Sequence, residues 1–143
     1  MKNPTIDYSL RTSWLAVKKM YDAEARKHDH TMSIGFTLLS IDPKLGSSST
    51  SLGPKMGIEA NSLSRLLKSM EEKKLIKRKP NPSDGRGIII FLTKKGIIKR
   101  DITREKVFRF NSLMNKRIGK EKINSFHKTA SIMKRIILEE KIF

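Results

Sequence analysis

The chain has 143 residues and a formal net charge of +17, from 31 Lys and Arg against 14 Asp and Glu. This length suits one folding domain, and the positive excess favours a polyanionic partner, nucleic acid first, over a merely lysine-rich solvated surface. The lack of cysteine excludes disulfides, cysteine-based zinc sites and thiol chemistry, and the lack of a secretion signal or a long apolar run predicts a cytoplasmic protein without a membrane partner.

Two helices are predicted in the first part of the chain. Residues 8–28 form the first, because apolar side chains recur there at steps of four, three and four, at Leu10, Trp14, Val17 and Tyr21. Thr31 is a suitable amino-terminal cap for the second helix, which keeps a helical apolar spacing until Asp42-Pro43. The polar stretch KLGSSSTS that follows is typical of a connector.

A short helix, a turn and a longer helix are predicted next. Pro54 lacks an amide hydrogen and suits a first helical turn, while Gly57 suits a helix end, so SLGPKMGI predicts only a short helix. In residues 60–73 the apolar side chains fall on one face of a helix, which we call the reading helix. The opposite face carries Asn61, Arg65, Lys68 and Glu72.

A β-hairpin and two further helices complete the predicted fold. LIKRK and GIIIFL are rich in strand-forming residues, and the segment PNPSDGR between them predicts a loop wider than a two-residue turn. Thr93 can cap a helix that runs to about Lys116, and Gly119 separates it from a last helix. The chain is therefore predicted to be mainly α with a small β-hairpin.

The order short helix, turn, helix, basic hairpin is that of a winged helix-turn-helix, in which the second helix enters the DNA major groove and the hairpin reaches the flanking backbone or minor groove. The charge distribution agrees, because thirteen basic residues and only four acidic ones lie between Lys55 and Arg100. Five polar or basic residues of the reading helix can supply donors and acceptors to base edges and phosphates: Asn61, Ser62, Ser64, Arg65 and Lys68.

Further contacts are predicted in the hairpin and the helix after it. Asp84 can fix the turn through its side chain, and Arg86 is carried outward, where the narrow minor groove of A·T-rich DNA favours arginine. Phosphate contacts that weaken with salt are expected from Lys77, Lys79, Lys94 and Lys95. The alternative for Asp84 and Arg86 is an ordinary solvated turn pair, and Arg65 could instead flank the core in an ion pair.

The segment LGPKMGIEANSLSRLLKSMEEKKLIKRKPNPSDGRGIIIFLTKKG resembles the winged-helix region of the MarR family of bacterial and archaeal transcription regulators. The resemblance runs in order through the short helix, the Ser64-Arg65-Leu66 of the reading helix, Asp84-x-Arg86, and Leu92-Thr93-x-x-Gly96. Three positions depart from the family pattern: Pro54, Glu59 at the cap of the reading helix, and Lys74, where many relatives have a helix-ending glycine.

The resemblance implies a single MarR-like domain over residues 1–143, with a winged helix-turn-helix at 31–93 flanked by dimerisation helices at 8–30 and 94–143. It implies a homodimer on a palindromic operator and, in many members, release by a small aromatic or anionic effector. Trp14 and Tyr21 are weak candidates for the wall of an effector pocket, since aromatic residues at helical spacing are more often core.

Other function classes have less support. EARKHDH offers Glu24, His28 and His30, but with only His127 elsewhere and no cysteine we expect no metal site and no cofactor. No phosphate loop or nucleophile-base pair indicates an enzyme. A winged-helix module that binds RNA or protein remains the alternative, although the chain lacks the exposed aromatics that stack on single-stranded bases.

Overall fold

Capping residues set the ends of the first two helices in the computed structural model, which describes residues 3–143. Helix α1 (Ile6–Arg26) begins after Thr5, whose hydroxyl oxygen accepts the Tyr8 amide hydrogen, so it starts and ends two residues before the predicted range. The predicted cap of α2 (Met32–Ser40) is confirmed, because Thr31 Oγ1 accepts the Ile34 amide hydrogen at 3.3 Å.

Helix α3 (Ser49–Met56) corrects the prediction for Pro54. The proline lies in the last turn of this helix and not in the first. The helix begins five residues before Pro54, so the missing amide hydrogen removes one hydrogen bond close to the helix end, where the loss interrupts little. Gly57 ends the helix as predicted, with a left-handed φ of 64°.

The reading helix is α4 (Ala60–Glu72), and its carboxy-terminal end departs from the usual chemistry. The Lys74 amide donates to Glu71 O and the Leu75 amide donates to Met70 O, both at 2.9 Å, which is the hydrogen-bond pattern of a Schellman motif. Lys74 has φ +59°, so a lysine occupies the left-handed position that glycine usually takes. The departure from the family pattern therefore leaves the helix end intact.

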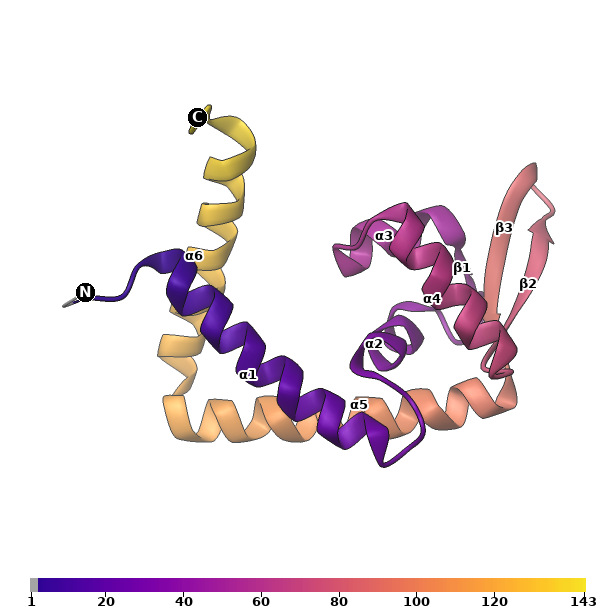
Figure 1. Ribbon diagram of the computed structural model, residues 1–143, viewed down its shortest axis with the longest axis horizontal. Helices are drawn as coiled ribbons and strands as arrows, with labels where there is room; N and C mark the ends of the chain where they lie inside the picture. Colours follow the sequence, from indigo (N-terminus) through magenta and orange to yellow (C-terminus); the bar gives the residue numbers. More distant parts are fainter. Residues whose placement is uncertain (1–2) are drawn as a thin grey trace. The chain divides into compact units, whose positions relative to one another are not determined.

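The sheet has three antiparallel strands in the order β1-β3-β2, from β1 (Ser47–Ser48), β2 (Ile76–Asn81) and β3 (Asp84–Leu92). The prediction of a simple connector missed β1, because two serines carry no strand signal and become a strand only by pairing with Ile89 and Ile90 of β3. In Figure 1 the β2–β3 hairpin extends beside α4 as a long, narrow projection.

The predicted wide loop at the hairpin tip is wrong. Asn81 pairs with Asp84, so only Pro82 and Ser83 connect the two strands. The register shifts between Pro80 and Asn81, which leaves residues 85–87 of β3 without a partner on β2. Gly85 and Gly87 therefore lie in a bulge within the hairpin and not in an open loop.

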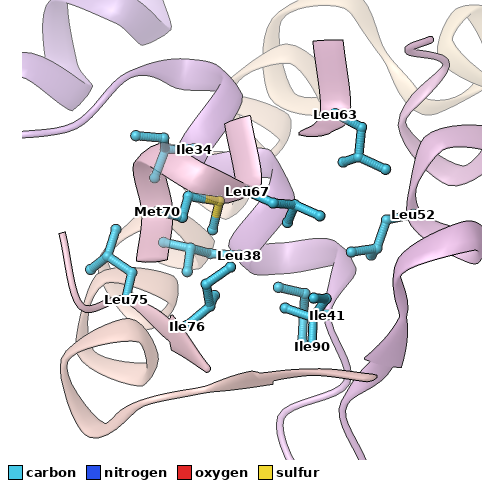
Figure 2. Packing of buried hydrophobic residues seen from close by; sticks show 10 residues of the cluster. All are labelled: Ile34, Leu38, Ile41, Leu52, Leu63, Leu67, Met70, Leu75, Ile76 and Ile90. Carbon is cyan, nitrogen blue, oxygen red and sulfur yellow. The ribbon is translucent and has the colours of Figure 1, made fainter. Parts of the chain in front are cut away.

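One apolar core holds α2, α3, α4 and the sheet together. Figure 2 shows its ten side chains converging from these elements. They are Ile34, Leu38, Ile41, Leu52, Leu63, Leu67, Met70, Leu75, Ile76 and Ile90. Because burying one such side chain stabilises a fold by about 1.5–3 kcal/mol, this core fixes the apolar face of α4 and leaves its polar face outward.

Close backbone approach fixes the start of α5 (Lys94–Ile118) against the end of α4. Thr93 caps α5 as predicted, since its Oγ1 accepts the Gly96 amide hydrogen at 3.0 Å, and the same hydroxyl donates to Lys74 O at 2.7 Å. A Cβ added at Gly96 would lie 2.0 Å from Leu75 O. Glycine at this position therefore lets α5 begin directly beside the end of the reading helix.

The chain divides into two compact units, one ending at Arg104 and the other comprising Glu105–Phe143, with α6 (Lys120–Glu139) in the second. No residue of Glu105–Phe143 is buried, and Phe108 and Leu138 are 73% and 85% exposed. The second unit thus has no apolar core of its own. No helix in residues 3–143 combines the length and apolar character needed to cross a bilayer.

Candidate nucleic-acid interface

The polar face of α4 is exposed as the sequence predicted. Leu63, Leu67 and Met70 are buried in the core on one side of the helix. The predicted contact residues are all exposed on the other side: Asn61, Ser62, Ser64, Arg65 and Lys68. Arg65 makes no ion pair in the described part of the chain, so the alternative of a core-flanking ion pair finds no support. The arrangement leaves a polar, basic ridge available to a partner.

Asp84 braces the wing through the backbone. Its Oδ1 accepts the amide hydrogen of Arg86 at 3.1 Å, and Asn81 Oδ1 accepts that of Ser83 at 3.0 Å. Both bonds link residues two apart, which is the geometry by which Asx side chains stabilise turns. The Arg86 side chain is exposed at the tip, where it can meet a partner.

The lysines of β2 lie on a different face of the sheet from the one that packs against α4. Side chains alternate along a strand, and Ile76 points into the core while Lys77 and Lys79 are exposed. Lys79 Nζ lies 5.3 Å from the ring centroid of Phe91, a cation–π contact. The structure therefore does not bring Lys77 and Lys79 onto the same sheet face as the reading helix.

The two predicted lysines of α5 differ in their surroundings. Lys94 and Lys95 are both exposed, but Lys95 Nζ donates a hydrogen bond to Lys73 O at 3.0 Å. A lysine ammonium near helix carbonyls complements the negative end of the helix dipole. Lys95 thus has a structural role at the end of α4, whereas Lys94 is free to meet solvent or a partner.

Sequence reasoning missed the contact between Arg78 and Glu71. Arg78 Nε lies 3.0 Å from Glu71 Oε2, an ion pair that joins β2 to α4, although its angle does not meet hydrogen-bond geometry. Strand alternation could have found this residue, since Ile76 points inward and Arg78, two positions later, must share its face. Arg78 is therefore the basic wing residue that faces the reading helix.

Two hollows flank α4. The first, of about 720 Å³, is lined by three basic and four hydroxyl side chains, together with Asp29, His30 and apolar ones. The basic and hydroxyl side chains are Arg26, Arg65, Lys73, Thr31, Ser33, Ser62 and Ser69. The second, which we call the wing-side hollow, measures about 700 Å³ and lies between α3, α4 and β2. Its basic and hydroxyl side chains are Ser49, Thr50, Ser64 and Arg78.

The two aromatic residues considered for an effector pocket are not brought together at either hollow. Trp14 is 53% exposed on α1. Tyr21 is 9% exposed and packs edge-on against Phe36, with ring centroids 5.4 Å apart. Burial raises the pKa of the Tyr21 hydroxyl above its ordinary value. Tyr21 is thus a core residue in this fold.

The histidine-rich corner after α1 is a structural junction. His30 is 6% exposed, its Nδ1 lies 3.0 Å from His28 O, and its Nε2 lies 3.4 Å from Thr103 Oγ1 of α5. Burial lowers the pKa of His30, with a further contribution from the Lys99 ammonium. Within residues 3–143 no group of three or more His, Asp or Glu side chains could hold a metal ion.

Comparison with known proteins identifies the fold. The crystal structure of an S. aureus MepR–DNA complex is 22% identical, with a TM-score of 0.83 over 92% of this chain and 97% of that one. The transcriptional regulator SlyA is 16% identical, with a TM-score of 0.83 over 94% of each chain. Streptococcus pneumoniae FabT in complex with DNA is 17% identical, with a TM-score of 0.76 over 95% of this chain and 97% of that one.

At these identities the similarity establishes a mainly helical winged helix-turn-helix fold with a small three-stranded sheet. No curated protein matches the chain. The family model of MarR matches residues 31–88, which extend from the cap of α2 into β3. The resemblance to the MarR family seen in the sequence motifs is therefore confirmed over residues 31–88.

Proposed function

We propose that this chain is a transcription regulator, and not an enzyme, that binds double-stranded DNA sequence-specifically as a homodimer on a palindromic operator. The observation that carries the proposal is the exposed polar face of α4, whose apolar face is fixed by the core. Two of the similar structures are complexes with DNA. The net charge of +17 supplies the long-range attraction to a polyanion.

The hollows on both sides of α4 support insertion of this helix into the major groove. A helix in that groove has one phosphate backbone on each side. Both hollows offer basic and hydroxyl side chains, which are the usual phosphate contacts. Asn61, on the exposed face of α4, and Arg65, at the edge of the first hollow, are suited to read base edges.

The exposed apolar residues support a homodimer. Large patches of this kind mark association surfaces, and neither α6 nor the rest of Glu105–Phe143 contains a buried residue. In the proposed single domain over residues 1–143, helices within 8–30 and 94–143 form the dimer and 31–93 bind DNA. The exposed apolar residues of these helices include Leu10, Trp14, Leu15, Phe108, Leu113, Phe126, Ile132, Ile136 and Ile137.

Arg65→Ala and Arg86→Ala test the proposal. Operators are first selected from random duplexes, and binding is then measured by fluorescence anisotropy at fixed salt. We expect Arg65→Ala to weaken operator binding by about 5- to 150-fold, from the roughly 1–3 kcal/mol of a base contact, with less effect on random duplex. Arg86→Ala should weaken affinity, most at operators with A·T-rich flanks.

Arg117→Ala is the matched control, because it removes an exposed arginine from the second unit and should leave the operator preference unchanged. An equal loss of affinity for operator and for random duplex in Arg65→Ala would exclude Arg65 as a residue that reads bases.

Tighter binding to RNA than to duplex DNA in a competition would favour the RNA-binding alternative. Light scattering that gives a monomer at micromolar concentration would refute the homodimer. Release of DNA by a small aromatic or anionic effector stays part of the proposal without assigned residues, since Trp14 and Tyr21 line neither hollow.

A further inference from the structure

We propose that Arg78 is a further DNA-contact residue and that Glu71 is a positioning residue, which holds the Arg78 guanidinium toward a backbone phosphate in the wing-side hollow. This inference rests on the proposed DNA-binding function. It assigns a productive role to an acidic residue on the reading helix, where an acid would ordinarily repel DNA.

One side of α4 faces the wing-side hollow. Ala60, Ser64 and Leu67 follow one another at steps of four and three, and all three line the hollow. Glu71, four residues further, continues the same helical row. Its carboxylate is therefore placed at the end of the hollow, where Arg78 enters from β2.

The ion pair uses only part of the guanidinium. Glu71 Oε2 lies 3.0 Å from Nε, and this nitrogen is covered from solvent. A guanidinium carries five N–H donors, four of them on the two terminal nitrogens. In the described part of the chain no hydrogen bond engages those terminal nitrogens, and the side chain as a whole is 30% exposed. Glu71 thus holds one edge of the group and leaves the phosphate-binding end unoccupied.

The hollow has the chemistry of a backbone-phosphate contact. Arg78 is the only basic side chain lining it, and Ser49, Thr50 and Ser64 add hydroxyl donors. The acidic Glu59 also lines the hollow. The attraction of the hollow for an anion therefore depends on the positive charge of Arg78. Because arginine meets phosphate in a planar, two-donor geometry, its orientation matters more than its charge alone.

Glu72 provides the matched control. It is the next residue of α4, it is exposed, and it makes no ion pair in the described part of the chain. Glu71→Gln and Glu72→Gln each remove one negative charge from the reading helix. Electrostatics alone predicts that both changes tighten DNA binding. A positioning role for Glu71 predicts instead that Glu71→Gln weakens DNA binding, while Glu72→Gln does not.

The experiment measures operator affinity by fluorescence anisotropy over a series of salt concentrations. We expect Arg78→Ala to weaken binding about tenfold and to reduce the salt slope by about one. Glu71→Gln should weaken binding several-fold, while Glu72→Gln leaves it unchanged or tighter. In the Arg78→Ala background, Glu71→Gln should no longer weaken binding, and Arg78→Lys should restore less than wild-type affinity because lysine lacks the planar fork.

Several results would overturn the inference. Glu71→Gln that binds as tightly as Glu72→Gln would show that the carboxylate does not position Arg78 for DNA. Weaker binding by Arg78→Ala with an unchanged salt slope would assign Arg78 a structural role only. If Glu71→Gln and Arg78→Ala do not show the expected loss of affinity while Arg65→Ala still loses operator discrimination, the proposed function stands without the Arg78 contact. If wild-type protein prefers no duplex, both proposals fall.

Discussion

The lysine at the end of α4 allows a direct test of the backbone conformation. Lys74 has φ +59°, and a residue with a side chain costs about 1–2 kcal/mol in the left-handed region. Glycine avoids that cost but loses about 0.5–1 kcal/mol through its greater freedom in the unfolded chain. Lys74 is exposed, and its side chain makes no hydrogen bond or ion pair with residues 3–143. Lys74→Gly should therefore stabilise the protein by roughly 0.5–1 kcal/mol.

The measurement is equilibrium unfolding in urea at fixed protein concentration, because association would otherwise shift the midpoint. A gain of this size raises the melting temperature by about 1–4 °C in a chain of this length. Lys73→Gly is the matched control, since it removes the same charge at φ −76°, where glycine has no advantage and should cost about 0.5–1 kcal/mol. Equal stability changes in the two variants would refute the conformational argument.

Two further predictions concern stability. Gly96→Ala should destabilise the fold by several kcal/mol, because its Cβ would lie 2.0 Å from Leu75 O, whereas Gly85→Ala meets no atom within 4 Å and should be tolerated in a urea titration. Burial lowers the pKa of His30 below its ordinary value of 6.5. Near pH 6 the His30 imidazole therefore binds a proton more readily in the unfolded chain than in the folded protein, and the free energy of unfolding should fall as the pH drops below about 6.5. Between pH 7.5 and 5.5, His30→Gln should reduce the dependence of the unfolding free energy on pH, whereas the control His28→Gln should not. An unchanged pH dependence in His30→Gln would show that His30 is not its cause.

Local signals in the sequence were sufficient for the caps of α2 and α5 and for the polar face of the interface. Thr31 and Thr93 cap α2 and α5 as predicted, because a hydroxyl oxygen can reach the free amides of its own first turn. The apolar period of α4 likewise determines which side enters the core, so the exposure of Asn61 and Arg65 follows from spacing alone.

Tertiary structure decided the features that depend on a partner distant in sequence. β1 is a strand only because β3 lies beside it, and the hairpin bulge depends on how Asn81 pairs with Asp84. The contact between Glu71 and Arg78 requires α4 and β2 to pack against each other. Periodicity and capping act over one or two helical turns, whereas strand pairing and ion pairs between elements are selected by the packing of the core, which no local pattern encodes.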